Sequence, residues 1–159
     1  MSFKWKQCNV SDPPRKAVQG GTDVGGEPMF VGRAMYNGVM LPAKIIPANG
    51  SAYVCYDGAE VPVFDVEVLT GKAKRFNWVP AAGGTVPDGA IPAGQYGDEQ
   101  LFIGRAFHEG SLTVGKVHPS HGVLYIPFGG AEVSCPHYEV LVSSGKRSFG
   151  GNNSSSDSD

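Results

Sequence analysis

The chain has 159 residues, of which 41% are hydrophobic and 18% are charged. This composition excludes a disordered chain, and the length allows one domain or two fused small domains. The formal charge of −2 argues against general binding to nucleic acid or acidic membranes, because such binding depends on clustered Lys and Arg.

The N-terminus and the cysteines bear on location. The first ten residues, MSFKWKQCNV, contain no apolar stretch of signal-peptide length, and no run in the chain approaches the ~20 apolar residues of a membrane span. Cys8, Cys55 and Cys135 are too few, and odd in number, for a disulfide framework. We therefore expect a cytoplasmic protein with reduced thiols and no membrane insertion, while export by a non-classical route stays open.

Glycine and proline decide the predicted fold class. The 23 glycines and 12 prolines are too many for long helices, and they are typical of short strands joined by tight turns. Turn pairs such as Asn37-Gly38 and Gly129-Gly130 separate the apolar runs. An all-β protein is predicted, with strands in chain order at residues 29–36, 52–57, 63–69, 101–108, 124–128 and 137–143.

The sequence repeats itself. MFVGRAMYNGVMLPAK (29–44) aligns with LFIGRAFHEGSLTVGK (101–116) at an offset of 72, and six of the sixteen positions agree. Upstream the offset is 73, which places Trp5 over Trp78. We expect two tandem β-sheet units related by an approximate two-fold axis, with each sheet completed across the duplication because one unit alone has a thin core.

The predicted units cover residues 1–72 and 73–143, joined by the polar connector GKAKRF. Residues 144–159 are dominated by Gly, Ser and Asp, a composition that cannot bury enough surface to order itself. We expect this tail to be disordered.

Two segments resemble a phosphate-binding or metal-binding motif but lack features that such a motif requires. GSLTVGKV (110–117) resembles a phosphate-binding loop, but Val117 follows the lysine and the segment favours a strand. His118 and His121 flank Pro119 and cannot share a helical face, so satisfied or exposed histidines are favoured over metal ligands. Standard hydrolase signatures are missing from the sequence, and neither a cofactor nor an enzymatic activity is predicted.

Several charged residues occupy matching positions in both copies, namely Arg33 and Arg105, Lys44 and Lys116, Glu60 and Glu132, and Glu67 and Glu139. A repeated salt bridge is the favoured interpretation for Glu67 and Glu139, whereas Lys44 and Lys116, placed just beyond a turn, could equally bind a ligand. An ammonium opposite a carboxylate suits the vicinal hydroxyls of a sugar, because each hydroxyl both donates and accepts. Matched Trp5 and Trp78 are more typical of a core than of a sugar site.

These motifs in order, a Trp, FxGRA, a turn leading to PxK or VGK, YxxxxGAE and YEVL, resemble the DM-nine repeat family twice over and cover nearly the whole chain. The resemblance implies a β-rich fold, dimerisation, and a mannose site formed by the Asp of a glycine-rich GxD and the Lys of PGK. Those positions here are Asp23 and Lys44. In the second copy they fall on Gln95 or Tyr96 and on Lys116.

The resemblance therefore predicts a homodimeric lectin for mannose or mannose-containing glycans that acts in innate recognition of microbial surfaces. Its sites would use Asp23 and Lys44 in the first copy, and Lys116 with Gln95 or Tyr96 in the second. The alternative is a cytosolic protein-interaction or stress-response protein whose repeated charges are structural.

Overall fold

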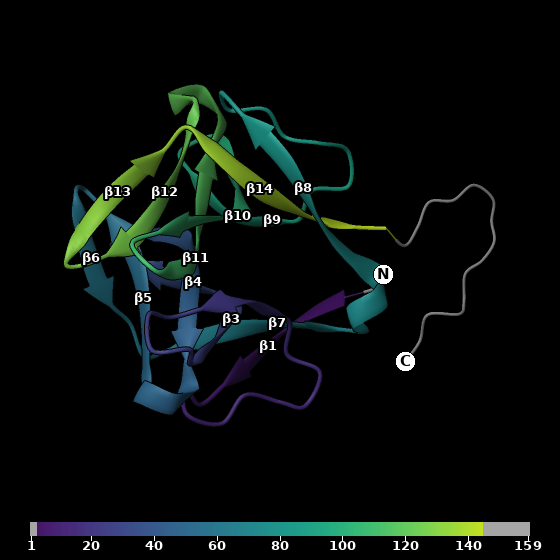
Figure 1. The fold of residues 1–159 in the computed structure, drawn as a ribbon, viewed down its shortest axis with the longest axis vertical. Helices are drawn as coiled ribbons and strands as arrows, with labels where there is room; N and C mark the ends of the chain where they lie inside the picture. The colour runs from purple at the N-terminus through teal and green to yellow at the C-terminus, as the bar shows by residue number, and fades with distance from the viewer. Residues whose placement is uncertain (1–2, 145–159) are drawn as a thin grey trace.

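The computed structural model describes residues 3–144, which form one network of fourteen strands (Figure 1). The all-β prediction is confirmed. The strands are β1 Phe3–Cys8, β2 Gln19–Thr22, β3 Pro28–Tyr36, β4 Val39–Ile46, β5 Ser51–Tyr56, β6 Ala59–Pro62, β7 Val66–Gly71, β8 Phe76–Ala82, β9 Pro92–Tyr96, β10 Glu99–His108, β11 Ser111–His118, β12 Val123–Phe128, β13 Ala131–Cys135 and β14 His137–Ser143. Three short 3₁₀ turns, η1 Pro47–Asn49, η2 Ala73–Arg75 and η3 Pro119–His121, complete the described part.

Tight turns fix the register of the two long hairpins. Asn37 and Gly38 adopt φ values of 54° and 79°, which places Tyr36 opposite Val39 in the β3–β4 pair. Asn-Gly suits such a turn because both residues tolerate positive φ. Glu109 and Gly110 serve the β10–β11 pair in the same way, at 46° and 86°. The turn predicted at Asn37-Gly38 is confirmed.

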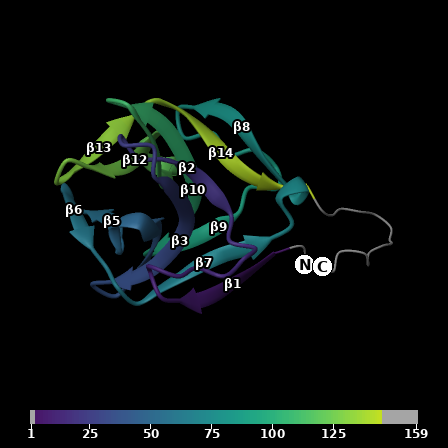
Figure 2. The ribbon, with the colours of Figure 1, turned by 60° about the horizontal axis from the view of Figure 1, so that its bottom comes forward.

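Strands of the first half (residues 3–72) pair with strands of the second half (73–144). β2 pairs with β11 at Thr22 and Leu112, and β9 pairs with β4 at Gln95 and Met40. β6 and β13 also meet, at Ala59 and Ala131. In Figure 2, β2 lies beside the green strands of the second half. The expected completion of the sheets across the duplication is confirmed, whereas the two-fold axis itself stays a prediction.

The halves share their core. One cluster of buried side chains combines Met29 and Leu69 from the first half with Ile91, Ile103 and Leu141 from the second, all at 0–1% exposure. Neither half therefore encloses this part of the core on its own, and burial of apolar surface favours their joint folding.

Arginine and glutamate join neighbouring strands at matching places. Arg33 Nε lies 2.7 Å from Glu67 Oε1, and its guanidinium stacks over the Trp5 ring at 4.5 Å. Arg105 pairs with Glu139 at 2.8 Å and stacks over Trp78 at 4.1 Å. The predicted repeated salt bridge is confirmed, and one face of each tryptophan is occupied by an arginine.

Lys44 and Lys116 lie inside strands, which corrects their predicted position just beyond a turn. The sequence did not predict β4 because the segment contains Pro42, and proline cannot donate a backbone hydrogen bond in a ladder. The strand tolerates it because β9 pairs at Met40 and β5 pairs at residues 44–46, so Pro42 falls between these two contacts.

The turn η2 occupies the predicted connector between the units. The tail predicted to be disordered lies, apart from residue 144, outside the described residues. Within residues 3–144, no helix has the length and apolar character needed to cross a membrane.

Candidate functional site

Lys44 is a buried cation held by acceptors from both halves. Its residue is only 4% exposed, and its Nζ lies 3.0 Å from Glu60 Oε2 and 2.6 Å from the Pro127 carbonyl oxygen. A buried ammonium must be paired and hydrogen-bonded to offset the loss of its hydration. These acceptors take two of its three N–H groups, which leaves one donor for a further acceptor.

Lys116 repeats this arrangement in the second half. It is 6% exposed, and its Nζ lies 2.8 Å from Glu132 Oε2 and 2.9 Å from the Cys55 carbonyl oxygen. Cys55 precedes Pro127 by 72 positions, the same offset that separates the lysines. Each lysine therefore pairs with a carboxylate of its own half and donates to a backbone carbonyl of the other half.

The same two carboxylates hold the facing turns. Glu60 Oε1 accepts the Gly130 N–H at 2.8 Å, and Glu132 Oε1 accepts the Gly58 N–H at 2.9 Å. Gly58 and Gly130 have φ values of 85° and 86°, a region that favours glycine. Each Lys–Glu pair thereby connects a strand of its own half with a turn of the other half.

The surroundings tune two groups in this network. Burial of Glu132 opposes its ionisation, but hydrogen bonds from Lys116 and the Gly58 N–H outweigh burial and lower the pKa of this carboxyl below its ordinary value. Burial raises the pKa of the Cys55 thiol, because the thiolate would lose its hydration. At neutral pH the network therefore holds an ionised carboxylate beside a protonated thiol.

Aromatic rings border both lysines. The Tyr53 and Phe128 ring centroids lie 5.4 and 5.8 Å from Lys44 Nζ. The equivalent rings of Tyr125 and Tyr56 lie 5.6 and 6.0 Å from Lys116 Nζ. An ammonium near a ring face gains cation–π attraction, and a ring can also cover the apolar face of a bound sugar.

Tyr96 joins the aromatic group near Lys116. Its ring centroid lies 6.4 Å from Tyr56 and 5.7 Å from His118, and Tyr36 packs against Tyr56 at 5.5 Å. Near Lys44 the matching contact is His108 on Phe128, at 4.8 Å. The structure therefore brings Tyr96 into the neighbourhood of Lys116, whereas the two lysine surroundings differ in chemistry.

Gln95 lies on β9, and Asp23 lies in the turn that follows β2. Each of these two strands pairs with a strand of the other half. Gln95 faces Met40 of β4, and its Nε2 donates to the Gly97 carbonyl at 3.1 Å. Asp23 follows β2, and its backbone bonds with Glu27 and Gly26 form the turn into β3. The carboxylate that the structure pairs with Lys44 belongs to Glu60. The sugar-site roles of Asp23 and Gln95 stay predictions.

His118 is a hydrogen-bonded histidine, as predicted. Its Nε2 lies 2.9 Å from Glu99 Oε1, and its ring stacks on His121 at 3.6 Å. Burial, followed by the neighbouring His121, lowers the pKa of His118, although Glu99 acts in the opposite direction. Within the described part of the chain, no group of three or more His, Cys, Asp and Glu side chains could hold a metal ion.

Sequence reasoning singled out the lysines and noted Glu60 and Glu132, but it missed that the backbone carbonyls of Cys55 and Pro127 complete the site. Backbone acceptors leave no residue-type signal. The constant offset of 72, which relates Cys55 to Pro127 as well as Lys44 to Lys116, was the one clue that the sequence held.

The family model described as the DM9 repeat matches residues 23–135. A search of curated proteins found no match. Among solved structures, the nematode sperm cell motility protein MFP2B has a similar fold, with a TM-score of 0.65 and 13% sequence identity. The match covers 92% of this chain and 48% of that chain, so the present chain spans about half its length.

Proposed function

Because this chain belongs to the DM9 repeat family, which is associated with carbohydrate binding, we propose that it is a lectin for mannose or mannose-containing glycans. We assign it to glycan recognition on microbial surfaces, without enzymatic activity. The first site would use Asp23 and Lys44, and the second Lys116 with Gln95 or Tyr96.

The observation that carries the proposal is the donor geometry of Lys44. Glu60 and Pro127 take two of its three N–H groups, at 3.0 and 2.6 Å. A sugar hydroxyl is a suitable acceptor for the third, since a bond from a charged donor is stronger than one between neutral groups. The hydroxyl could then donate a hydrogen bond of its own to the Asp23 carboxylate.

The nearby rings support a sugar ligand over a simple anion. Phe128 borders Lys44, and the Tyr56 and Tyr96 rings form a group beside Lys116. Tyr96 stands 73 residues after Asp23. If the first half has the same arrangement, Asp23 borders Phe128, and a carboxylate and a ring face meet beside the ammonium.

Binding of a single sugar at such a site would be weak. Two sites in each chain, doubled by the proposed homodimer, would raise the avidity for a glycan-coated surface through effective concentration. We place the protein in the cytoplasm, with non-classical export as the route to external glycans.

The rival proposal, a protein-interaction module with structural lysines, is favoured by one observation. Lys44 and Lys116 are only 4% and 6% exposed and tie the two halves together. Exposed apolar side chains, such as Phe107 at 79% and Phe64 at 72%, would then contact the partner protein.

Titration calorimetry with mannose separates the two proposals. Asp23→Asn keeps the side-chain shape, leaves the lysine network intact, and should weaken binding at the first site by about tenfold, the equivalent of one charge-assisted hydrogen bond. Asp88→Asn, an exposed turn residue, is the matched control and should bind as the unmodified protein does. Folded protein that binds no mannose at millimolar concentration would favour the interaction module.

A further inference from the structure

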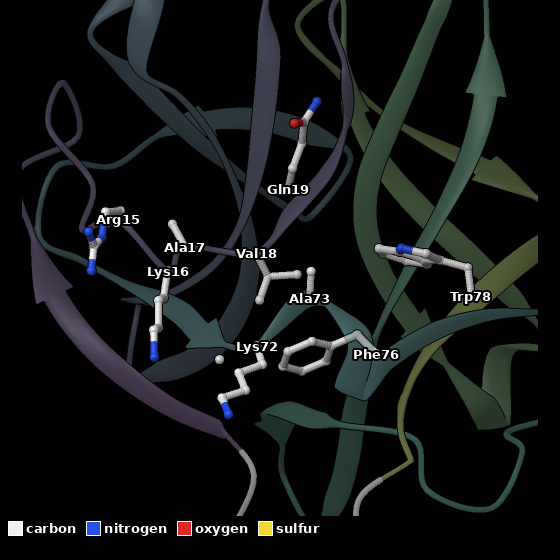
Figure 3. Close-up of a pocket in the computed structure, with 10 residues that line it drawn as sticks. Arg15, Lys16, Ala17, Val18, Gln19, Lys72, Ala73, Phe76 and Trp78 are labelled. Carbon is white, nitrogen blue, oxygen red and sulfur yellow. The ribbon is translucent and has the colours of Figure 1, made fainter. Parts of the chain in front are cut away.

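A pocket lies away from the lysine network, where the first and second halves join. It has a volume of about 500 Å³, in the range of small-molecule sites. Three elements form it: the turn before β2, the end of β7 with η2, and the start of β8 (Figure 3). The Gly71 N–H donates to the Lys16 carbonyl at 3.1 Å, which holds the first two of these elements together.

The pocket separates charge from aromatic surface. Among the described residues that line it, the charged ones are Arg15, Lys16 and Lys72, and all three are cations. Figure 3 shows them gathered toward one side, with the rings of Phe76 and Trp78 toward the other. A site with this polarity suits a ligand that carries an anionic group at one end and a ring at the other.

The three cations are a property of the first half alone. The second half has Asp88 and Gly89 at the positions 73 residues after Arg15 and Lys16, and Ser144 at the position 72 residues after Lys72. The second copy therefore forms its strands without this positive charge, so the repeat fold does not require it.

The side chains at the rim have distinct roles toward an oxyanion. Arginine presents a planar fork that binds two phosphate oxygens, whereas lysine acts as a compact point charge.

The two rings that line the pocket are packed against other side chains. Phe76 packs against Phe3, with ring centroids 6.4 Å apart, and Arg105 lies over one face of Trp78. Both rings are thus held in place before any ligand arrives, which reduces the ordering cost of binding.

We propose that this pocket binds a phosphomonoester carried on a ring, that is, a sugar phosphate or a mononucleotide. Arg15, Lys16 and Lys72 contact the phosphate, and Phe76 and Trp78 contact the ring. The proposal is independent of mannose binding, since its residues differ from those of the lysine network.

Titration calorimetry of the full chain, with mannose 6-phosphate, AMP and inorganic phosphate as probes, tests this. At least one ring phosphate should bind more tightly than inorganic phosphate, and the tighter of the two identifies a sugar or a nucleoside source. The double variant Lys16→Gln/Lys72→Gln should weaken that binding at least about tenfold, because each lysine supplies a charge-assisted hydrogen bond. Mannose binding in this variant should be unchanged.

Two further variants make the test specific. Lys6→Gln/Lys74→Gln removes the same charge from exposed positions outside the pocket lining and should change affinity by less than about twofold, the size of a screened surface effect. Phe76→Leu should weaken the ring phosphate but not inorganic phosphate, in protein whose circular dichroism is unchanged. Equal binding of inorganic phosphate and ring phosphates, equal losses in both double variants, or no binding by any probe would overturn the proposal.

Discussion

Lys44 Nζ lies 2.6 Å from the carbonyl oxygen of Pro127, 83 residues further along the chain. The matching contact, Lys116 to the Cys55 carbonyl at 2.9 Å, runs in the opposite direction between the halves. Two buried ammonium groups therefore join the two halves of the protein, and the same two groups are the proposed sugar contacts. Stability and binding are consequently linked at these positions.

Replacement of Lys44 should destabilise the whole protein. Lys44→Met leaves the Glu60 carboxylate, whose side chain is 13% exposed, without its cation, and breaking a buried pair in this way costs about 3–5 kcal/mol. Urea unfolding measures the loss. Exposed Lys74→Met is the control and should stay within about 0.5 kcal/mol of the unmodified protein. A Lys44→Met protein of unchanged stability would show that the pair does not fasten the halves.

A side chain at Gly115 should destabilise the protein. A Cβ at this position would lie 2.1 Å from the Tyr125 carbonyl oxygen, a backbone atom of the neighbouring strand β12. Gly115→Ala should therefore cost about 2–4 kcal/mol, as overpacking and backbone displacement do. Gly97→Ala faces open space at φ 62° and should cost only about 1 kcal/mol. If thermal unfolding gave the same loss of stability for both variants, the strands β11 and β12 would have to move apart easily at Gly115.

Acid should weaken the second lysine pair. The pKa of Glu132 is lowered in the folded state, so its stabilising contribution is present above the unfolded value and is lost as pH falls through the lower folded value. The free energy of unfolding should therefore decline below about pH 4.5, the ordinary value of the group. Glu132→Gln cannot titrate and should show a shallower decline. Identical slopes for both proteins would contradict this assignment.

The cysteines should differ in reactivity. Cys8 is half-buried, whereas Cys55 and Cys135 are buried, and burial raises the pKa of all three thiols. Since the thiolate is the reactive form, alkylation at pH 8 should label Cys8 first and Cys55 only after unfolding. Mass spectrometry of peptides after timed iodoacetamide exposure gives the order. Rapid labelling of Cys55 in folded protein would show that its surroundings open readily.

The sequence predicted much of this molecule through its repeat. The offset of 72 was enough to identify the Arg33 and Arg105 strands, their glutamates and the repetition of Lys44 at Lys116, but not the location of these lysines inside strands. Local patterns sufficed there because turn residues and alternating apolar positions report on neighbouring residues.

What the sequence did not predict depends on contacts between distant residues. The pairing of β2 with β11 rests on a single residue pair, Thr22 and Leu112, and no local pattern encodes it. β1 was not predicted, because the lysines of FKWKQC outweigh its apolar residues. The burial of Lys44 also lay beyond reach, since a lysine is ordinarily a surface residue, even in an apolar segment such as VMLPAKII.

A crystal structure of the protein with saturating mannose tests the central claim most directly. The proposal predicts a sugar hydroxyl oxygen at about 2.7–3.2 Å from Lys44 Nζ, with the ring near Phe128 and a second hydroxyl on the Asp23 carboxylate. The same crystals soaked with galactose, whose hydroxyls are arranged differently, should leave the position empty. Mannose that binds elsewhere, or a Lys44 neighbourhood that stays unoccupied at saturation, would contradict the assignment of these residues to a sugar site.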